Sequence, residues 1–225
     1  MSVLLRTAFG VLVIDRFPLS LGAAELLGRL HPDEVALART WGERRQRTFA
    51  MGRIVARQAL AALGAEHPAP ILKDDRGAPA VPAPLSLSLS HKDEVAAALL
   101  SLEGQAHVGV DLEPLSERER ARDIAAHVLT ARELAELTDM DEDARRREVL
   151  VRFALKEALY KALDPWVRRY VGFLEVEARA PGDGNAREAR FTLGLPAQEG
   201  PFVVTGQLLH VEELAVSLVR VAQPS

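Results

Sequence analysis

Hydrophobic and polar positions along this chain form blocks that predict strands and helices in a repeated order. Residues 7–15 carry a continuous apolar run, which predicts a buried strand. A helix is expected to begin near Pro32, because proline suits a first helical turn, and a second helix is expected over 44–63, ending at Gly64. The prolines within 65–84 then predict an extended loop.

The strand pattern returns after this loop. Three segments alternate between apolar and polar residues or are continuously apolar, and the short polar breaks between them suit hairpin turns. These segments are 85–91 (LSLSLSH), 94–102 and 107–113. They predict an antiparallel meander in the middle of the chain.

Helices and strands are both expected in the part of the chain that follows residue 113. Two capping boxes, Ser116 with Glu119 and Thr130 with Glu133, predict the start of two helices. A further helix is expected around 145–163, with Pro165 ending it. Four strand-like segments finish the chain, with a turn at 182–185 after the first, and they span 171–179, 188–195, 201–209 and 214–221.

The first part of the chain resembles the second at three places, in the same order. The segment FAMGRIVAR at 49–57 resembles FALKEALYK at 153–161, and HKDEVAAAL at 91–99 resembles HVEELAVSL at 210–218. The third match sets Leu30, Glu34 and Ala36 against Leu129, Glu133 and Ala135. We therefore predict an internal duplication, with two related halves and a cleft between them where a ligand binds.

Composition narrows the classes of protein that remain. The chain has 225 residues, 48% of them hydrophobic, which is enough for a sizeable core. It has no cysteine, which excludes disulfides and thiolate metal sites and fits the cytoplasm. The net charge of −4 predicts no general attraction to nucleic acid or to anionic membranes, and the apolar runs are too short to span a bilayer. The segment MSVLLRTAFG lacks a long apolar region with a small-residue cleavage site, so we do not expect secretion.

Two acidic residues stand at alternate positions of the expected strand 107–113. Asp111 and Glu113 should lie on the outward face, while Val108, Val110 and Leu112 face the core. Same-face neighbours on a strand are ~6.5–7 Å apart at Cα, so both carboxylates can reach one hard cation such as Mg²⁺. The alternative is an exposed acidic strand end.

A third acid lies on the expected helix 153–163. Glu157 stands between Lys156 and Lys161, and Lys161 is its i,i+4 neighbour. The simplest interpretation is an ordinary surface ion pair. The interpretation changes when Glu157 is combined with the acidic strand, because three acids beside two lysines suit a divalent metal next to a phosphate-bearing substrate.

Two further groups of residues suit anions. In 85–91 the serines should face outward. The strand ends in Ser90 and His91, whose hydroxyl and imidazole can bind an anion. The basic run of Arg44, Arg45 and Arg47 could bind phosphates, although a solvated helix face is the default for such charges. The chain lacks the motifs of P-loop nucleotidases, dinucleotide-binding folds, α/β-hydrolases and zinc proteases.

Taken together, four segments resemble the 4′-phosphopantetheinyl transferases of the surfactin-synthetase-activating type. They are GVDLE at 109–113, FALKEALYK at 153–161, Ser90 with His91, and the helix RRQRTFAMGRIVAR at 44–57. The resemblance implies an α+β pseudodimer of two related α/β halves with antiparallel sheets and coenzyme A in the cleft. Residues 1–106 would form the half on the nucleotide side, and 107–225 the half on the metal and catalytic side.

The resemblance also implies the reaction. Such an enzyme moves the 4′-phosphopantetheine arm of coenzyme A, its co-substrate, to a serine of an acyl or peptidyl carrier protein and releases adenosine 3′,5′-bisphosphate. It uses Mg²⁺, with Mn²⁺ as an alternative ion. We expect a monomer in the cytoplasm that binds neither nucleic acid nor membrane.

Residue roles follow from the same resemblance. Asp111, Glu113 and Glu157 would hold the metal, and Glu157 could also take the proton from the carrier serine. Lys156 and Lys161 would contact the pyrophosphate, so the catalytic set comprises Asp111, Lys156, Glu157 and Lys161. The candidates for the nucleotide end, above all its 3′-phosphate, are Arg45, Arg53, Lys73, Arg76, Ser90 and His91.

Two positions depart from the pattern of the family. Phe153 stands where many members have tryptophan, and Ala78 stands where many have a lysine before a proline, so Arg76 or Lys73 would compensate. Two other functions stay open: a different magnesium-dependent transferase acting on a nucleotide or nucleotide sugar, and an inactive module that binds carrier proteins.

Overall fold

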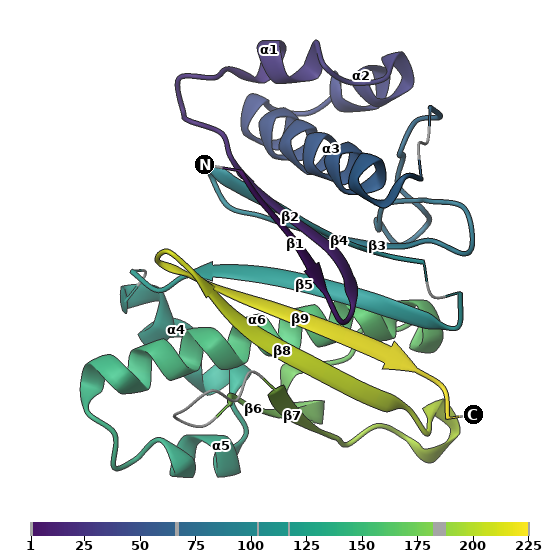
Figure 1. Cartoon of the computed structure of the whole chain (residues 1–225). Helices are drawn as coiled ribbons and strands as arrows, with labels where there is room; N and C mark the ends of the chain where they lie inside the picture. The colour runs from purple at the N-terminus through teal and green to yellow at the C-terminus, as the bar shows by residue number, and fades with distance from the viewer. Residues whose placement is uncertain (1, 66–67, 103, 117, 182–187, 225) are drawn as a thin grey trace. The chain divides into compact units, whose positions relative to one another are not determined.

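The protein has an α+β fold with two antiparallel sheets (Figure 1). The computed structural model describes residues 2–65, 68–102, 104–116, 118–181 and 188–224. The chain divides into two compact units, Met1–Gly104 and Gln105–Ser225. The turn expected at 182–185 lies outside the described residues, as does the side chain of Glu119. The cleft expected between the halves stays a prediction.

The first unit is one long helix packed on a four-stranded sheet. The helix α3 (Glu43–Leu63) ends at Gly64, whose φ of 70° is the left-handed conformation that glycine tolerates. Its apolar face packs on β4, which is buried along its whole length. The strands lie in the order β1-β2-β4-β3, with bounds β1 Val3–Thr7, β2 Gly10–Arg16, β3 Ser86–His91 and β4 Val95–Ser101. Two short helices precede α3, α1 (Ala23–Leu27) and α2 (Pro32–Ala38).

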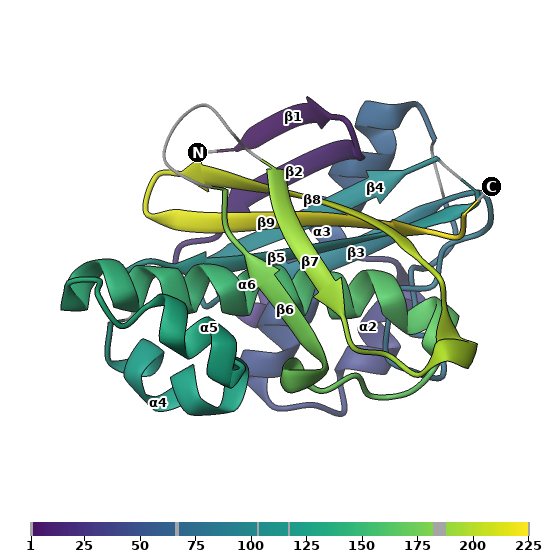
Figure 2. The same ribbon diagram turned by 90° about the horizontal axis from the view of Figure 1, so that it is seen from below.

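The second unit repeats this plan with a five-stranded sheet and the long helix α6 (Glu142–Val167). Figure 2 shows α6 running along the sheet, with α4 (Arg118–Val128) and α5 (Ala131–Glu136) on its far side. The strand order is β5-β9-β8-β7-β6, with bounds β5 Ala106–Pro114, β6 Val176–Arg179, β7 Glu188–Leu193, β8 Val203–Val211 and β9 Leu214–Ala222. Two 3₁₀ turns, η1 (Phe173–Glu175) and η2 (Ala197–Glu199), lie before β6 and β8.

Helix α6 approaches β5 unusually closely at one glycine. A Cβ atom added to Gly109 would lie 1.8 Å from the carbonyl oxygen of Ala158, so no other residue fits there without movement of the backbone. The absence of a side chain at Gly109 brings α6 directly onto the strand. The face of β5 that carries Gly109 is therefore the face that α6 covers.

A buried glutamate performs the same task in each unit. Glu34 accepts hydrogen bonds from the backbone of His31 in its capping box and from Ile71, and it pairs with Arg57 of α3 at 2.8 Å. This arrangement joins a short helix, a long helix and the segment that follows the long helix.

Its counterpart Glu133 accepts from the backbone of Thr130 in its own capping box and from Ala178, and it pairs with Lys156 of α6 at 2.6 Å. Both carboxylates are almost inaccessible to water. Buried charges persist only when they are paired and hydrogen-bonded. The two glutamates occupy corresponding positions of the repeat, but their cations do not, since Arg57 corresponds to Lys161 and not to Lys156.

Several boundaries differ from the sequence-based predictions. The prediction that Pro165 ends the long helix is wrong, because α6 continues through it and ends at Arg168, which has a φ of 49°. The strand expected at 171–179 begins only at Val176, after η1. The strand expected at 7–15 is β2, which forms a hairpin with β1. The hydrophobic periodicity did not predict the short helix α1.

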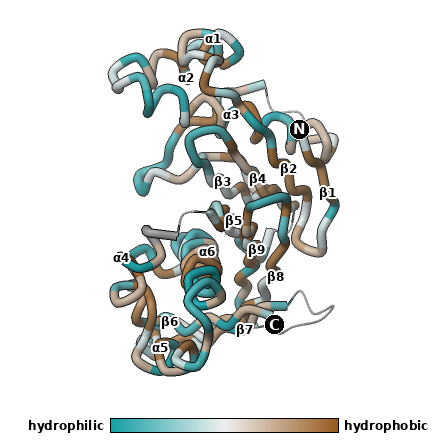
Figure 3. Tube along the Cα trace, turned by 90° about the vertical axis from the view of Figure 1, so that its left-hand side faces the viewer, coloured by the Kyte–Doolittle hydropathy of each residue, from teal (hydrophilic) through white to brown (hydrophobic). Residues whose placement is uncertain are grey.

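Hydropathy along the trace follows this arrangement. Figure 3 shows hydrophobic positions concentrated in the strands and on one side of the long helices, with hydrophilic positions in the outer helices and loops. Among the described residues, no helix combines the length and apolarity needed to cross a membrane.

Candidate active site

The two acids of β5 are buried beneath α6. Asp111 is 5% exposed and Glu113 is 1% exposed. They share a strand face with Gly109, whose missing side chain lets α6 approach. The prediction that these carboxylates face outward is therefore wrong. Alternation identified which residues share a face, but the helix decides that this face is interior.

Lys161 joins the acidic strand to the helix. From α6 its ammonium donates to the carboxylate of Asp111 at 2.8 Å and to the backbone oxygen of Val110 at 2.9 Å. It thus reaches across to β5 instead of pairing with Glu157 one turn away. About a quarter of its side chain (27%) stays exposed. An ammonium carries three donors, so one N–H remains beyond these two bonds.

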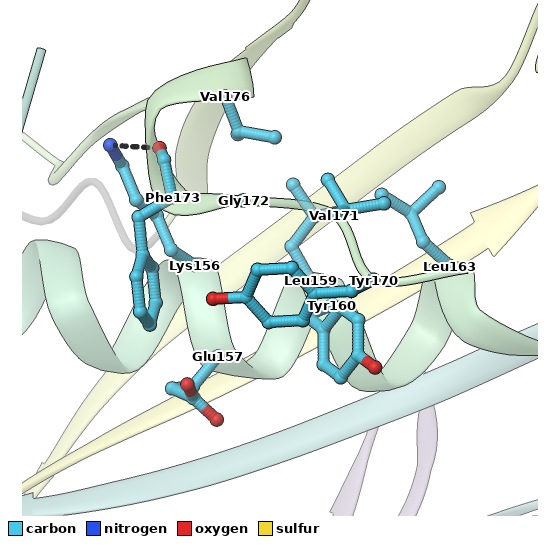
Figure 4. A pocket seen from close by; sticks show the side chains of 10 residues that line it. All are labelled: Lys156, Glu157, Leu159, Tyr160, Leu163, Tyr170, Val171, Gly172, Phe173 and Val176. Atoms are coloured by element: carbon cyan, nitrogen blue, oxygen red, sulfur yellow. Dashed lines mark hydrogen bonds between the residues drawn. The ribbon is translucent and has the colours of Figure 1, made fainter. Parts of the chain in front are cut away.

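Glu157 lies on α6 beside a small cavity of ≈ 70 Å³ (Figure 4). The cavity lies between α6 and the segment that runs from the end of α6 into β6. Most of its walls are apolar or aromatic, and its lining residues are Lys156, Glu157, Leu159, Tyr160, Leu163, Tyr170, Val171, Gly172, Phe173 and Val176. The sequence patterns did not identify Tyr160 and Tyr170 as site residues, because aromatic residues at such positions are usually assigned to the hydrophobic core.

The three predicted metal ligands do not form a ready three-ligand cluster. Within the part of the chain that the structure describes, no group of three or more histidine, aspartate or glutamate side chains could hold a metal. The donor set that remains is the carboxylate pair of Asp111 and Glu113. Mg²⁺ is commonly held by one or two carboxylates together with water and substrate phosphates, so this pair fits that ion.

Lys156 is enclosed in the protein. Its ammonium donates to Glu133 at 2.6 Å and to the backbone oxygens of Val128 and Phe173 at 2.7 and 2.9 Å, the last bond drawn in Figure 4. Burial lowers its pKa, and Glu133 partly offsets that effect. All three donors are used, so the expectation that Lys156 contacts the pyrophosphate is corrected: the lysine ties the cavity wall at Phe173 to α6.

The first unit contains a cluster of cations around Trp41. The guanidinium of Arg45 lies 4.3 Å from the centre of a Trp41 ring, and the ammonium of Lys73 lies 4.6 Å from it. Burial lowers the pKa of Lys73, and the nearby charges of Arg45 and Arg53 lower it further. No carboxylate among the described residues pairs with Arg45 or Lys73, so this cluster suits an anion. Trp41 was missed by the sequence analysis, although an aromatic residue next to a basic run is a usable signal.

Arg53 supports this cluster from inside. Its guanidinium donates to the backbone oxygens of Ile71 at 2.6 Å and Leu72 at 3.2 Å, and it lies over the ring of Phe49. Burial lowers its pKa to about 10. The expectation of a direct phosphate contact is corrected, because the side chain is only 4% exposed and holds the segment that carries Lys73.

The remaining candidates lie at two other places in the first unit. Arg76 stands in a tight turn where Asp74 accepts hydrogen bonds from the backbone of Arg76 and Ala78. His91 is exposed at the end of β3, whereas Ser90 is 6% exposed. The serines of β3 are buried, so the prediction that they face outward is wrong. The roles of Arg76, Ser90 and His91 stay predictions.

Comparison with known families identifies both parts of the chain. Residues 33–101 match a model described as "4'-phosphopantetheinyl transferase N-terminal domain", and residues 107–217 match the "4'-phosphopantetheinyl transferase superfamily". Together the two models span most of the chain.

The curated proteins that match this chain are also 4′-phosphopantetheinyl transferases. The chain is 34% identical over 180 residues to the 4′-phosphopantetheinyl transferase Npt of Nocardia iowensis, covering 75% of this chain and 79% of that one. It is 33% identical to PptT of Mycobacterium tuberculosis, covering 71% and 69%. A holo-(acyl-carrier-protein) synthase from Bacillus anthracis, solved with coenzyme A, matches with 25% identity and a TM-score of 0.42 over 52% of this chain and 96% of its own.

Proposed function

Because this chain belongs to the 4′-phosphopantetheinyl transferase family, we propose that it transfers the phosphopantetheine arm of coenzyme A to a serine of an acyl or peptidyl carrier protein. The observation that carries this proposal is the contact of Lys161 with Asp111, which places a cation and a buried carboxylate together beside the helix of Glu157. The by-product is adenosine 3′,5′-bisphosphate. We assign the chain to the surfactin-synthetase-activating type, because it has a separate N-terminal half that matches its own family model.

Asp111 and Glu113 are the proposed ligands of Mg²⁺, or of Mn²⁺ in its place. Their burial on one strand face suits a hard cation that needs oxygen ligands and also contacts the pyrophosphate of coenzyme A. When bound, such an ion neutralises charge that develops on the leaving phosphate. Lys161 holds Asp111 in orientation and directs its remaining N–H at a phosphate oxygen.

Glu157 is the proposed general base. Its position on α6 and its half-buried side chain suit a carboxylate that accepts the proton of the carrier serine. The serine oxygen then bonds to the phosphorus that bears the arm, and the bond from that phosphorus to the bridging oxygen breaks. This scheme does not need Glu157 as a third ligand of the metal, the role predicted from the sequence, since two carboxylates and substrate oxygens suffice for Mg²⁺.

The nucleotide end and the phosphopantetheine arm of coenzyme A are proposed to bind chemically different groups of residues. Arg45 and Lys73, which both lie over the Trp41 ring, are the proposed contacts of the 3′-phosphate. The uncharged arm suits the cavity next to Glu157, whose walls are mostly apolar with a few backbone polar groups. We place the enzyme in the cytoplasm as a monomer.

The proposal is tested by incubating the protein with coenzyme A, Mg²⁺ and an apo carrier domain and weighing the carrier by mass spectrometry. A gain of one phosphopantetheine group on the carrier serine is expected. An unchanged carrier mass with several unrelated carriers would contradict the proposal. A reaction supported instead by a nucleoside diphosphate sugar or triphosphate would point to the alternative transferase.

A further inference from the structure

Ser217 carries a buried hydroxyl that makes no hydrogen bond within the part of the chain that the structure describes. It lies on β9, and its side chain is 0% exposed. A serine hydroxyl has one donor and two acceptor sites, and leaving them unmet in the interior costs free energy that an alanine at the same place would not cost. A hydroxyl in such a position indicates a role other than packing.

The neighbours of Ser217 on β9 and β8 are apolar. Ala215 and Val219, two residues away on either side, share its face of the sheet and belong to clusters that contain apolar residues of α6. Leu208 is opposite Ser217 on β8 and is also part of such a cluster. The face of β9 that carries Ser217 is therefore the face that α6 covers.

The neighbour of Ser217 on β5 is Asp111. The two strands are adjacent and antiparallel (Figure 1), and their register sets Asp111 directly opposite Ser217. Residues paired in this way share a face and have Cβ atoms about 4.5–5.5 Å apart. By turning about χ1, the serine hydroxyl can reach the carboxylate directly or through one water. Lys161 donates to Oδ1 of this carboxylate, which offers about four acceptor sites in all.

The first unit has an apolar pair at the corresponding place. In the match between 91–99 and 210–218, Ser217 corresponds to Ala98. Ala98 lies on β4 directly opposite Val13 of β2, and both residues are buried in the apolar core beneath α3. Packing of a long helix on this part of a sheet therefore does not require a hydroxyl. In the second unit the hydroxyl accompanies the acid.

We propose that Ser217 is a positioning residue for the metal site: its hydroxyl holds the carboxylate of Asp111 in the orientation that binds Mg²⁺. This inference rests on the proposed function, because it takes Asp111 as a ligand of the ion. Groups that hydrogen-bond the ligands of a metal fix their orientation, and removing one typically costs about 10–100-fold in metal affinity or activity. Ser217 acts through Asp111 and adds no step to the reaction.

The test measures the binding of Mn²⁺ to the protein in the presence of coenzyme A, from the electron paramagnetic resonance signal of the free ion. For Ser217→Ala we expect a dissociation constant roughly tenfold higher than that of the wild type. Ser217→Thr keeps a hydroxyl and should bind Mn²⁺ much as the wild type does. Ser101→Ala is the matched control, because Ser101 is also a buried strand serine but has Ser86 opposite it, and it should leave Mn²⁺ binding unchanged.

The melting temperature separates this role from a purely structural one. Replacing a buried hydroxyl that has no hydrogen bond by alanine should leave the melting temperature unchanged or raise it, while metal binding weakens. Transfer by Ser217→Ala should recover as the Mn²⁺ concentration is raised, because the loss lies in binding and not in kcat. A lower melting temperature with unchanged Mn²⁺ binding would overturn the inference.

If Ser217→Ala does not fold, Ser217→Cys carries the test, since a thiol fills the same place but is only a weak donor. Weaker Mn²⁺ binding is again expected, and normal binding by a folded Ser217→Cys protein would also overturn the inference. Failure of the proposed function would look different, because the wild type itself would then take up no Mn²⁺ in the presence of coenzyme A. That result would overturn the metal site together with the role of Ser217.

Discussion

Lys161 on α6 and Asp111 on β5 form an ion pair at 2.8 Å across the closest approach of helix and strand. The pair exists because Gly109, two residues before Asp111, lets α6 lie directly on β5. The lysine and the carboxylate come from motifs about fifty residues apart in the chain. Their contact locates the proposed reaction at this crossing.

Asp111→Asn should reduce transfer strongly. The substitution keeps the size of the side chain and an acceptor for Lys161 but removes the charge that the proposed metal site needs. Loss of one preorganised charge contact costs about 10²–10³-fold in kcat. Asp15→Asn is the matched control, because Asp15 is also a strand aspartate with a polar partner, Gln58 at 3.1 Å, but lies in the first unit. Carrier mass spectrometry under single-turnover conditions measures both. Equal activity of the two variants would contradict the assignment of Asp111.

Lys156→Met should act on stability instead of on substrate binding. The substitution leaves Glu133 buried without its cation, and breaking a buried pair in this way costs about 3–5 kcal/mol. Urea unfolding should show this loss, and the double variant with Glu133→Gln should recover part of it. The folded Lys156→Met protein should bind coenzyme A with nearly normal affinity by calorimetry. Normal stability with lost affinity would instead restore the pyrophosphate contact first predicted for Lys156.

Lys73 should make the binding of coenzyme A sensitive to alkaline pH. Its pKa is lowered, chiefly by burial, and an anion favours the charged form of the ammonium. Affinity should therefore be complete below this lowered pKa and fall as the pH rises through it, before an ordinary lysine would lose its proton. Calorimetric titrations from neutral to alkaline pH measure the effect.

Two comparisons make this test specific. Lys73→Arg should remove the fall, because an arginine stays protonated over this range. Dephospho-coenzyme A, which lacks the 3′-phosphate, should show little dependence in the wild type. A fall of the same size with both ligands would argue against the contact between Lys73 and the 3′-phosphate.

Gly109→Ala should destabilise the second unit severely. The new methyl group would meet the backbone of Ala158 at 1.8 Å, and only a shift of α6 away from β5 relieves that clash. We expect a loss of at least ~2 kcal/mol in the free energy of unfolding, together with loss of transfer as Lys161 moves from Asp111. Gly22→Ala is the control, because nothing lies within 4 Å of its added Cβ and its φ of −69° suits any residue. Equal melting temperatures for the two variants would contradict the close approach.

Much of this protein could be predicted from its sequence because local rules decide local structure. Pro32 in a first helical turn and the capping box of Thr130 with Glu133 place the starts of α2 and α5, and Gly64 ends α3. The alternation in β3 and β5 also identified which residues share a face. The paired acidic and helical motifs named the family, which both family models and the curated relatives support.

The sequence by itself determined most of the elements and their order, the two-part layout and the residues proposed to carry the chemistry. Only the tertiary structure decided which of those residues are available to a substrate. Lys156 and Lys161 stand in one motif, yet the first ammonium is closed in by Glu133 and two backbone oxygens while the second reaches Asp111 with part of its side chain exposed. Whether a strand face or an ammonium is buried depends on what packs against it, and that neighbour comes from a distant part of the chain.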